Sequence, residues 1–228
     1  VHYLPVTDHD ERWGIVCTTA GYQNVPPGSP YPLTQHPDSY SFTRSRGRVL
    51  GEYQLLYIVS GQGEFRSASS PAAPVKAGTV VMLFPDEWHT YAPDPETGWE
   101  EWWVGFRGEN IDRRVAEGFF SPKTPLLHIG HSAGIVSCYQ EIIRSAEEER
   151  KGFQQLVTGI VLHLLGSVLF KRDNLQYLDN PIVEKINRAR EMMRRHIGDS
   201  LPPEEIARRL NSGYTWFRRT FRAYVGIA

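Results

Sequence analysis

The segment 202–226 constrains the fold more than any other part of the chain, because its pattern is that of two short helices joined by a tight turn. Pro202 and Pro203 favour a helix start, where the proline nitrogen needs no hydrogen-bond partner. The Asn-Ser-Gly run at 211–213 supplies turn-forming residues, and Gly213 tolerates almost any backbone angle. Gly226 fits a C-terminal stop. The apolar positions recur at helical spacing in both halves: Ile206, Ala207, Leu210, Phe217, Phe221 and Val225.

The second of these helices carries side chains that suit DNA. Its outward positions are polar: Thr215, Arg218, Arg219 and Arg222. A helix fits the major groove, and an arginine there can donate two hydrogen bonds to one guanine. The pattern therefore predicts a DNA recognition helix. The alternative is an ordinary amphipathic hairpin with a solvated basic face.

The local sequence supports the first interpretation. The range 210–228 resembles the first helix-turn-helix of the AraC family of bacterial transcription regulators. That family carries two such motifs joined by a long helix. This sequence ends at Ala228, where the joining helix is expected, so the second motif is absent from it. We predict that residues 176–228 form a partial helix-turn-helix domain that binds operator DNA.

The resemblance also implies roles for individual residues of this helix. Thr215, Arg218 and Arg219 lie where the family reads bases. Tyr214 and Arg222, at the two ends, are expected to meet phosphate.

Charge is unevenly distributed along the 228 residues. The whole chain has a net charge of −1, but residues 181–228 carry +5 and residues 1–180 carry −6. A basic module joined to an acidic one suggests that only the C-terminal part meets phosphate, although solvated helix charges would give the same count. We expect no signal peptide and no apolar run long enough to span a membrane. Cys17 and Cys138 lie far apart and fit a reducing, cytoplasmic location.

The first 107 residues are typical of short strands separated by glycine and proline. Such spacing predicts a β-sandwich or a small barrel. A turn at 61–63 and a proline-rich arm at 25–37 interrupt the series. The predicted strands are 14–20, 39–44, 53–59, 64–66, 79–84, 88–91 and 99–107.

Three glycine- and proline-containing motifs in this region resemble a cupin barrel: Gly61-x-Gly63, Lys76-Ala77-Gly78 and Phe84-Pro85-x-x-x-His89. More narrowly, the ranges 48–54 and 99–106 resemble the sensor barrel of AraC-family regulators. The resemblance thus covers both ends of the chain, in the order that the family uses. The predicted fold class is α+β: an N-terminal cupin-like β-barrel with a helical dimerisation segment, then an all-α helix-turn-helix. The first domain is predicted at 1–175.

Helical periodicity replaces strand patterns after Gly108. Ser132 is a plausible N-cap for a helix with apolar positions from Ile135 to Ile143, and a second apolar helix follows Gly152. These helices could be buried against their own barrel, or one could pack on a partner subunit as in the resembled family. The two interpretations are compatible, and we predict a homodimer formed through residues 135–170. A polar linker at 171–180 precedes a bracing helix that begins at Pro181.

A metal-dependent enzyme is disfavoured by the histidine count. Many cupins hold a metal with several histidines and a glutamate from facing strands. His89 is the only histidine between Val49 and Arg107, and no nucleophile-elbow motif is present. We therefore predict no metal, no cofactor and no catalytic residues. His89 is expected to be a hydrogen-bonded barrel residue or a ligand contact.

The run Trp99-x-Glu101-x-Trp103 favours ligand binding instead. Strand alternation puts these three side chains on one face, where aromatic rings beside a carboxylate suit a sugar. The alternative is that the tryptophans only fill the core. On the preceding strand, His89 and Tyr91 share a face with Glu87.

The resemblance to the sensor barrel implies specific contacts. Tyr91, Glu101 and Trp103 lie where that barrel contacts its sugar, and Arg46 or Arg48 supplies an arginine. Glu101 stands where the arabinose-binding prototype has histidine, which puts arabinose itself in doubt. An N-terminal arm, at about 18–31, is expected to close over the ligand.

The sequence therefore predicts a cytoplasmic, ligand-responsive transcription regulator of the AraC type. Its expected partners are operator DNA, a small-molecule effector of the saccharide class, and a second copy of the chain. The alternative is a cupin-type enzyme acting on a small sugar, with the C-terminal segment serving only for structure.

Overall fold

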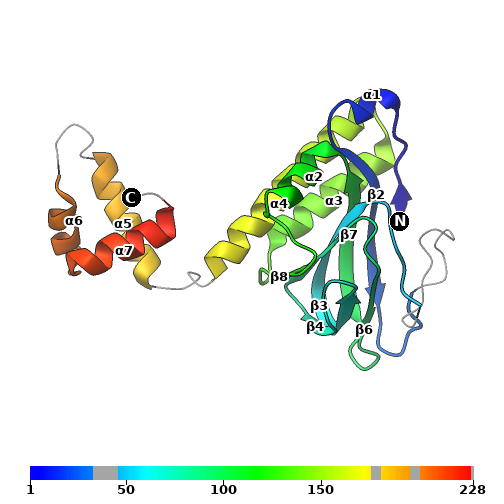
Figure 1. Cartoon of the computed structure of the whole chain (residues 1–228), viewed down its shortest axis with the longest axis horizontal. Coiled ribbons are helices and arrows are strands. Elements are labelled where there is room, and N and C mark those ends of the chain that lie inside the picture. The colour runs from blue at the N-terminus through cyan, green and yellow to red at the C-terminus, as the bar shows by residue number, and fades with distance from the viewer. Residues whose placement is uncertain (33–45, 176–180, 196–200, 227–228) are drawn as a thin grey trace. The chain divides into compact units, whose positions relative to one another are not determined.

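The chain divides into two compact units, Val1–Arg172 and Asp173–Ala228 (Figure 1). The computed structural model describes residues 1–32, 46–175, 181–195 and 201–226. The first unit contains β1 (His2–Tyr3), α1 (Asp8–Glu11), β2 (Val16–Val25), β3 (Tyr53–Ser67), β4 (Ala73–Lys76), β5 (Thr79–Leu83), β6 (His89–Pro93), β7 (Trp99–Arg107), α2 (Glu109–Ala116), β8 (Leu126–His128), α3 (Ala133–Glu148) and most of α4 (Phe153–Asn174). The second contains α5 (Pro181–Arg195), α6 (Pro203–Arg209) and α7 (Tyr214–Val225).

The described strands of the first unit form an antiparallel barrel. Their main path runs β1-β2-β7-β3-β5-β8, and β4 and β6 both pair with β3. The first part of β3 pairs with β5 and β7, and its last part, from Gln62, pairs with β4 and β6. A single long strand therefore belongs to both halves of the barrel. The α+β class with a cupin-like N-terminal barrel and a helical C-terminus is confirmed.

The predicted turn at 61–63 is wrong, because β3 continues without interruption to Ser67. The strand bends there instead of reversing. Its register against β7 shifts between Ile58 and Ser60, and Gly61 has a positive φ of 80°. A Cβ atom on Gly61 would lie 2.1 Å from the carbonyl oxygen of Gly98, so only glycine permits this close approach. The Gly-x-Gly motif thus marks a change of sheet partner.

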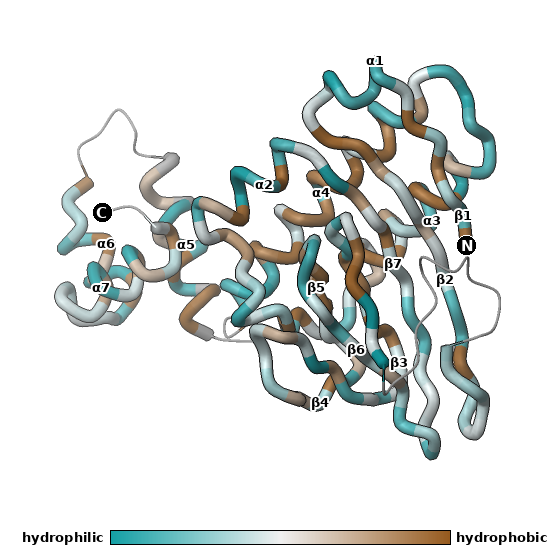
Figure 2. Tube along the Cα trace, turned by 45° about the vertical axis from the view of Figure 1, so that its right-hand side comes forward, coloured by the Kyte–Doolittle hydropathy of each residue, from teal (hydrophilic) through white to brown (hydrophobic). Residues whose placement is uncertain are grey.

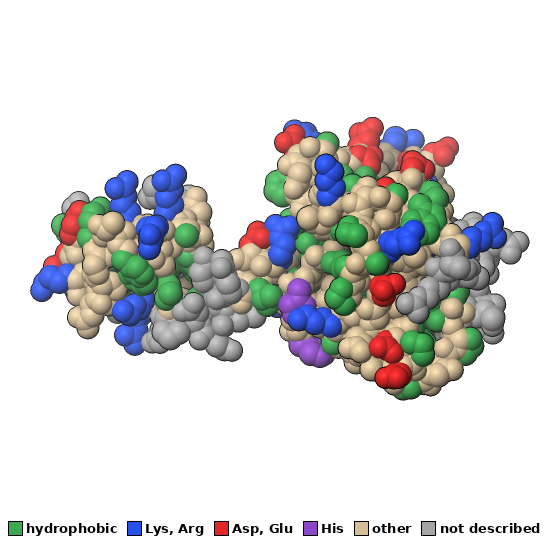
Figure 3. All heavy atoms as spheres, turned by 60° about the horizontal axis from the view of Figure 1, so that its bottom comes forward, with side chains coloured by type: hydrophobic (Ala, Val, Ile, Leu, Met, Phe, Trp, Pro, Cys, Tyr) green, Lys and Arg blue, Asp and Glu red, His purple; other side chains and the backbone are tan. Residues whose placement is uncertain are grey.

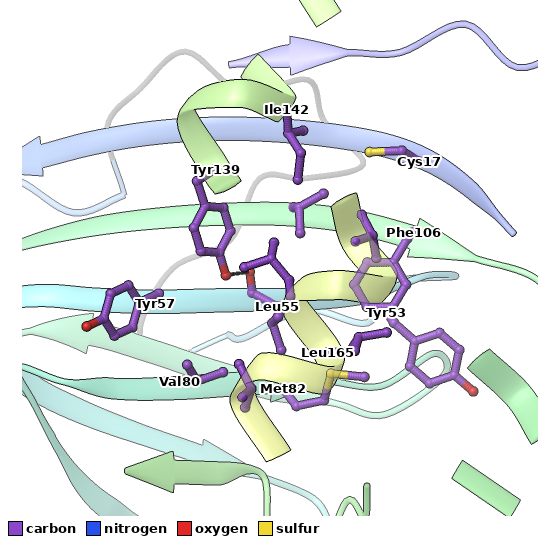
Figure 4. Close-up of a cluster of buried hydrophobic side chains, with 14 of the residues drawn as sticks. Cys17, Tyr53, Leu55, Tyr57, Val80, Met82, Phe106, Tyr139, Ile142 and Leu165 are labelled. Carbon is purple, nitrogen blue, oxygen red and sulfur yellow. Dashed lines mark hydrogen bonds between the residues drawn. The ribbon is translucent and has the colours of Figure 1, made fainter. Parts of the chain in front are cut away.

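The two faces of the sheet bury separate cores. Along β7, Trp102, Val104 and Phe106 face the helices, whereas Trp99 and Trp103 face the barrel interior. Figure 4 shows the helix-side core, where Leu165 of α4 lies over the strands and Tyr139 of α3 points toward β3. The Tyr139 hydroxyl donates a hydrogen bond of 3.0 Å to the carbonyl oxygen of Leu55. Side-chain alternation therefore separates a structural face from an interior face.

The predicted α3–α4 pair is confirmed. Ser132 caps α3 by accepting a hydrogen bond of 3.4 Å from the backbone N–H of Ile135. Helix α4 buries five aliphatic side chains in the helix-side core: Val157, Val161, Leu164, Leu165 and Val168. Its hydrophobic residues appear as brown segments in Figure 2.

The expectation that no apolar run reaches the length of a membrane span is wrong for α4. This helix has 22 residues, and an 18-residue window within it has a mean hydropathy of 1.6, so it is long and apolar enough to cross a membrane by length and composition. One face is buried on the barrel, so packing within its own unit accounts for part of its apolar composition.

The second unit packs α5, α6 and α7 around a small core made of Ile186, Ala189, Ile206, Ala207, Leu210 and Phe217. The predicted helix–turn–helix boundaries and the Gly226 cap (φ 77°) are confirmed. The predicted Asn-Ser-Gly turn is confirmed, but the residue in the left-handed conformation is Asn211 (φ 49°), whereas Gly213 has an ordinary φ of −66°. Asparagine is a residue that tolerates this conformation.

Some elements escaped the sequence patterns. Strands β1, β4 and β8 have two to four residues each, and α1 has four, so none is long enough to repeat a hydrophobic pattern several times. The predicted strand at 39–44 and the end of the proline-rich arm at 25–37 lie outside the described residues. The expectation of an arm at about 18–31 is wrong for its first part, because residues up to Val25 belong to β2, which pairs with β7.

Candidate functional site

Strand β7 supplies the interior face on which the candidate site is built. Trp99, Glu101 and Trp103 are only 2%, 3% and 8% exposed, as their alternation predicted. Gly21 of β2 lies opposite Trp103, and a Cβ there would come within 2.2 Å of the indole ring. A glycine at this position therefore gives the Trp103 indole its place inside the barrel.

Arg48 forms hydrogen bonds with three of the polar side chains in this interior. Its guanidinium donates hydrogen bonds to the Tyr91 hydroxyl at 2.7 Å, to His89 Nε2 at 3.2 Å and to Gln54 Oε1 at 3.5 Å. The backbones of Arg48 and His89 also exchange two hydrogen bonds, of 2.9 and 3.0 Å. These bonds fix the arginine beside the aromatic ring of Tyr91, 5.6 Å from its centroid.

His89 is a neutral member of this network. Burial, and then the neighbouring charge of Arg48, lower the pKa of His89 to about 4. Its Nε2 accepts from Arg48 Nε, so its Nδ1 carries the proton and donates 3.0 Å to the backbone oxygen of Glu87. His89 therefore orients Arg48, as the sequence expectation of a hydrogen-bonded barrel histidine described.

Glu101 is a buried carboxyl at the centre of the aromatic face. The Tyr31 hydroxyl donates to its Oε1 at 3.1 Å. Burial raises the pKa of Glu101 to about 7, against the lowering effects of Tyr31 and Arg48. The Tyr31 ring also lies 5.8 Å from Trp99 and 6.1 Å from Tyr91 between centroids. A carboxyl in this setting can exchange a proton near neutral pH.

These side chains border one cavity, which we call the barrel cavity. It has about 30 Å³ of free volume, enough for about two water molecules. A saccharide would therefore need the segment that carries Tyr31 and Pro32 to move. The cavity is lined by Val1, Tyr3, Thr19, Gln23, Tyr31, Pro32, Arg48, Gln54, Tyr91, Glu101 and Trp103.

The structure brings most of the predicted ligand residues together. Arg48, Tyr91, Glu101 and Trp103 line the barrel cavity, and His89 and Trp99 contact its lining residues. Arg46 does not line it: the residue is exposed, and its carbonyl oxygen accepts a hydrogen bond from the Trp88 indole. Glu87 lies outside β6 and accepts a hydrogen bond from the backbone N–H of Ser69.

Sequence reasoning missed the contribution of Thr19, Gln23 and Gln54. Thr19 and Gln23 lie on β2, and Gln54 lies near the start of β3. Polar residues at alternate strand positions could have indicated these cavity residues in the sequence. Which of the alternate positions face the cavity, however, depends on the register in which β2 and β3 pair with β7.

The candidate DNA-contacting residues lie on the outer side of α7. Tyr214, Thr215, Arg218, Arg219 and Arg222 are all exposed, opposite the buried Phe217. Lys and Arg side chains are prominent on the surface of this unit (Figure 3). On α6, by contrast, Glu205 pairs with both Arg208 and Arg209, at 2.7 and 2.8 Å. The ion pairs found within the described residues include none of the α7 arginines.

Within the described ranges, no group of three or more His, Cys, Asp or Glu side chains is placed to hold a metal ion. The barrel cavity and the side chains packed beside it instead offer a guanidinium, a carboxyl, three phenols and two indoles.

The AraC-like ligand binding domain family matches residues 27–165 of the chain. The Msm operon regulatory protein of Streptococcus mutans is 22% identical over 183 residues, which cover 79% of this chain and 65% of that protein. The raffinose operon transcriptional regulatory protein RafR of Pediococcus pentosaceus is 29% identical over 94 residues, which cover 40% of this chain and 34% of that protein. The chain thus spans less than two thirds of the length of these curated relatives.

Among solved structures, ToxT from Vibrio cholerae, bound to an unsaturated fatty acid, aligns over 94% of this chain and 73% of its own, at 12% identity and a TM-score of 0.35.

Proposed function

The chain belongs to the family of AraC-like ligand binding domains, and on that premise we propose that it is a ligand-responsive, DNA-binding transcription regulator that senses a saccharide. The observation that carries the proposal is the position of Glu101. This carboxyl is 3% exposed, on the same face of β7 as the indoles of Trp99 and Trp103.

The barrel cavity matches the chemistry of a sugar. Indole faces stack on the C–H faces of a sugar ring, whereas a carboxylate accepts and a guanidinium donates hydrogen bonds to hydroxyl groups. Trp103, Glu101 and Arg48 supply these three functions around one cavity. The name of one relative, the raffinose operon transcriptional regulatory protein RafR, also supports a saccharide.

The second unit would carry the DNA-binding activity. Helix α7 presents Thr215, Arg218 and Arg219 as base readers, with Tyr214 and Arg222 at phosphates. The domain roles follow the sequence prediction, with a sensor and dimerisation domain at 1–175 and a partial helix-turn-helix domain at 176–228. We further propose that the protein works as a cytoplasmic homodimer without a catalytic role.

A second candidate is a cupin-type enzyme acting on a small sugar. It is favoured by the raised pKa of Glu101, about 7, because a carboxyl that titrates near neutral pH can serve as a general acid or base. Turnover of a bound sugar, abolished in Glu101→Gln, would establish the enzyme.

Selection of genomic DNA fragments by the purified chain tests the regulator directly. We expect the wild-type chain to enrich a small set of related sites, and a saccharide to change the amount recovered. The matched control is the double variant Arg218→Ala/Arg219→Ala, which should enrich none of them. Equal recovery by the wild-type chain and the control would refute sequence-specific DNA binding by α7.

A further inference from the structure

Helix α6 carries one carboxylate that binds two arginines. Glu205 Oε2 accepts a hydrogen bond of 2.7 Å from Arg208 Nε. Glu205 Oε1 accepts one of 2.8 Å from Arg208 Nη2 and another of 2.8 Å from Arg209 Nε. The bond to Arg208 is therefore bidentate, a geometry that strengthens the pairing of a guanidinium with a carboxylate. The bonds from Arg208, and then those from Arg209, lower the pKa of Glu205 to about 2, so this carboxylate is charged at neutral pH.

Both arginines are open to solvent. The side chains of Arg208 and Arg209 are 76% and 47% exposed, whereas that of Glu205 is 26% exposed. An isolated ion pair at a protein surface contributes little to stability, but a bidentate pair that shares its carboxylate with a second arginine belongs to the class that holds its geometry. With Glu204, the two acids of α6 balance its two arginines. The pairing therefore neutralises exposed positive charge on this helix.

These arginines lie next to the helix for which we propose DNA binding. They occupy the last turn of α6, and α7 begins at Tyr214. The connecting turn is tight, because the backbone N–H of Ser212 donates a hydrogen bond of 3.0 Å to the carbonyl oxygen of Ala207. The two helices also pack on one core (Figure 1). The end of α6 is therefore adjacent to the end of α7 that carries Tyr214.

Helix α7 has the opposite charge pattern. It contains three arginines and no acidic residue, and none of these arginines belongs to the ion pairs found within the described residues. Arginines bind DNA phosphates and release counterions, and this sequence-independent effect supplies most of the affinity for unrelated DNA. An arginine that holds a carboxylate must give up that bond before it binds a phosphate. Glu205 therefore competes with DNA for the arginines of α6.

We propose that Glu205 is a specificity-determining residue of the second unit, because it withholds Arg208 and Arg209 from DNA phosphates. This inference rests on the proposed function of α7 as the helix that binds DNA. Base contacts fix the orientation of a sequence-specific complex, whereas a non-specific complex takes the orientation that pairs most cationic side chains with phosphates. Withholding two arginines therefore weakens binding to unrelated DNA more than binding to an operator.

The variant Glu205→Gln tests the proposal, because it keeps the size of the side chain and removes its charge. The matched control is Glu204→Gln, which removes the same charge from the neighbouring, exposed residue of α6. Fluorescence anisotropy of a labelled duplex of mixed sequence is measured with the full 228-residue chain, below the melting temperature of every variant. Salt concentrations between about 50 and 200 mM give the slope of log K against log salt.

We expect Glu205→Gln to bind this duplex at least about threefold more tightly than the wild-type protein at about 50 mM salt. The slope should steepen by about one to two, because up to two arginines gain a phosphate. Glu204→Gln should change the slope by less than about half a unit, since it releases no arginine. For a genomic site that the wild-type chain enriches, the ratio of its affinity to that of the mixed duplex should fall about threefold in Glu205→Gln.

The double variant Arg208→Gln/Arg209→Gln separates this mechanism from direct repulsion between Glu205 and DNA. In that background, Glu205→Gln should have no larger effect than Glu204→Gln, because no arginine remains to be released. A gain of the same size with and without the two arginines would overturn the proposal, since the carboxylate would then repel DNA by itself.

Equal affinities of Glu205→Gln and Glu204→Gln for the mixed duplex, or an unchanged affinity ratio for the enriched site, would also overturn the proposal and leave DNA binding by α7 intact. If the wild-type chain binds neither duplex even at about 50 mM salt, the proposed DNA-binding function fails, and this inference fails with it. The wild-type protein alone therefore distinguishes the two failures.

Discussion

Glu101 shows how a single residue acquires its properties from its position. Strand alternation turns it into the barrel, burial leaves it 3% exposed, and the loss of solvent raises its pKa to about 7. Tyr31, Arg48 and Trp99 oppose that shift, and Tyr91 is a further titratable group close to Glu101. A carboxyl that titrates near pH 7 couples the stability of the barrel to proton concentration.

The first prediction concerns this coupling. The folded state binds the Glu101 proton more tightly than the unfolded state, in which the pKa is close to 4.5. Stability contributed by this group is therefore complete below pH 4.5 and is lost as pH rises through about 7. The loss between pH 4.5 and 8 should be about 3 kcal/mol in the wild-type protein and absent from Glu101→Gln.

Urea denaturation at both pH values, with Glu100→Gln as a control on the other face of β7, measures this difference. The same pH dependence in Glu101→Gln and in the wild-type protein would show that Glu101 ionises normally.

At the scale of elements, the sequence predicted what depends on local periodicity and missed what depends on partners. The alternation of Trp99, Glu101 and Trp103 predicted the bounds of β7 and its interior face, and Ser132 predicted the start of α3. The sequence predicts a turn at Gly61 where the structure has a bend, because sequence does not tell whether a glycine reverses a strand or bends it between two partners. Gln23 was missed because its place opposite Glu101 is set by the pairing of β2 with β7.

Helix α4 carries the dimerisation prediction. Exposed positions recur every three or four residues along α4 and so form one side of the helix. This side bears two large hydrophobic residues, Leu156 (52% exposed) and Phe170 (67% exposed), with Gly159 and Gly166 between them. Glycine in a helix interior costs about 1 kcal/mol relative to alanine, but it permits a second helix to approach closely.

We expect a homodimer, and we expect Leu156→Lys/Phe170→Lys to weaken it at least about tenfold. Sedimentation equilibrium measures the dissociation constant, with Gln140→Lys on the exposed side of α3 as the control. A wild-type chain that is monomeric at all concentrations, with and without a saccharide, would contradict the prediction.

Helix α7 allows base reading to be separated from phosphate binding. Arg218→Ala or Arg219→Ala should cost about 1–3 kcal/mol in DNA affinity and relax sequence preference, because a bidentate base contact is lost. Arg222→Ala should weaken binding to all sequences alike and reduce the slope of log K against log salt by about one. Fluorescence anisotropy of labelled DNA at several salt concentrations distinguishes a base contact from a phosphate contact. Identical behaviour of all three variants would show that α7 binds only the DNA backbone.

At the scale of the whole molecule, the two units divide the two tasks. The acidic first unit encloses the barrel cavity, and the basic second unit exposes the α7 arginines. This division could be predicted from sequence, since the charge imbalance and the change from strand to helix periodicity are both visible in it. The small free volume of the cavity could not be predicted from sequence. The Tyr31 side chain, which lines the cavity and bonds to Glu101, comes from a segment without hydrophobic periodicity.

The central claim is that the barrel cavity binds a saccharide, and isothermal titration calorimetry of the purified chain tests it most directly. The Trp103→Ala variant opens the cavity wall, and Trp13→Ala, which removes a 58% exposed indole, serves as the matched control. We predict that at least one neutral mono- or oligosaccharide binds the wild-type protein and Trp13→Ala with a dissociation constant between about 1 µM and 1 mM, and binds Trp103→Ala at least about tenfold more weakly. Equal binding by all three proteins, or no saccharide bound by the wild-type protein, would contradict the account.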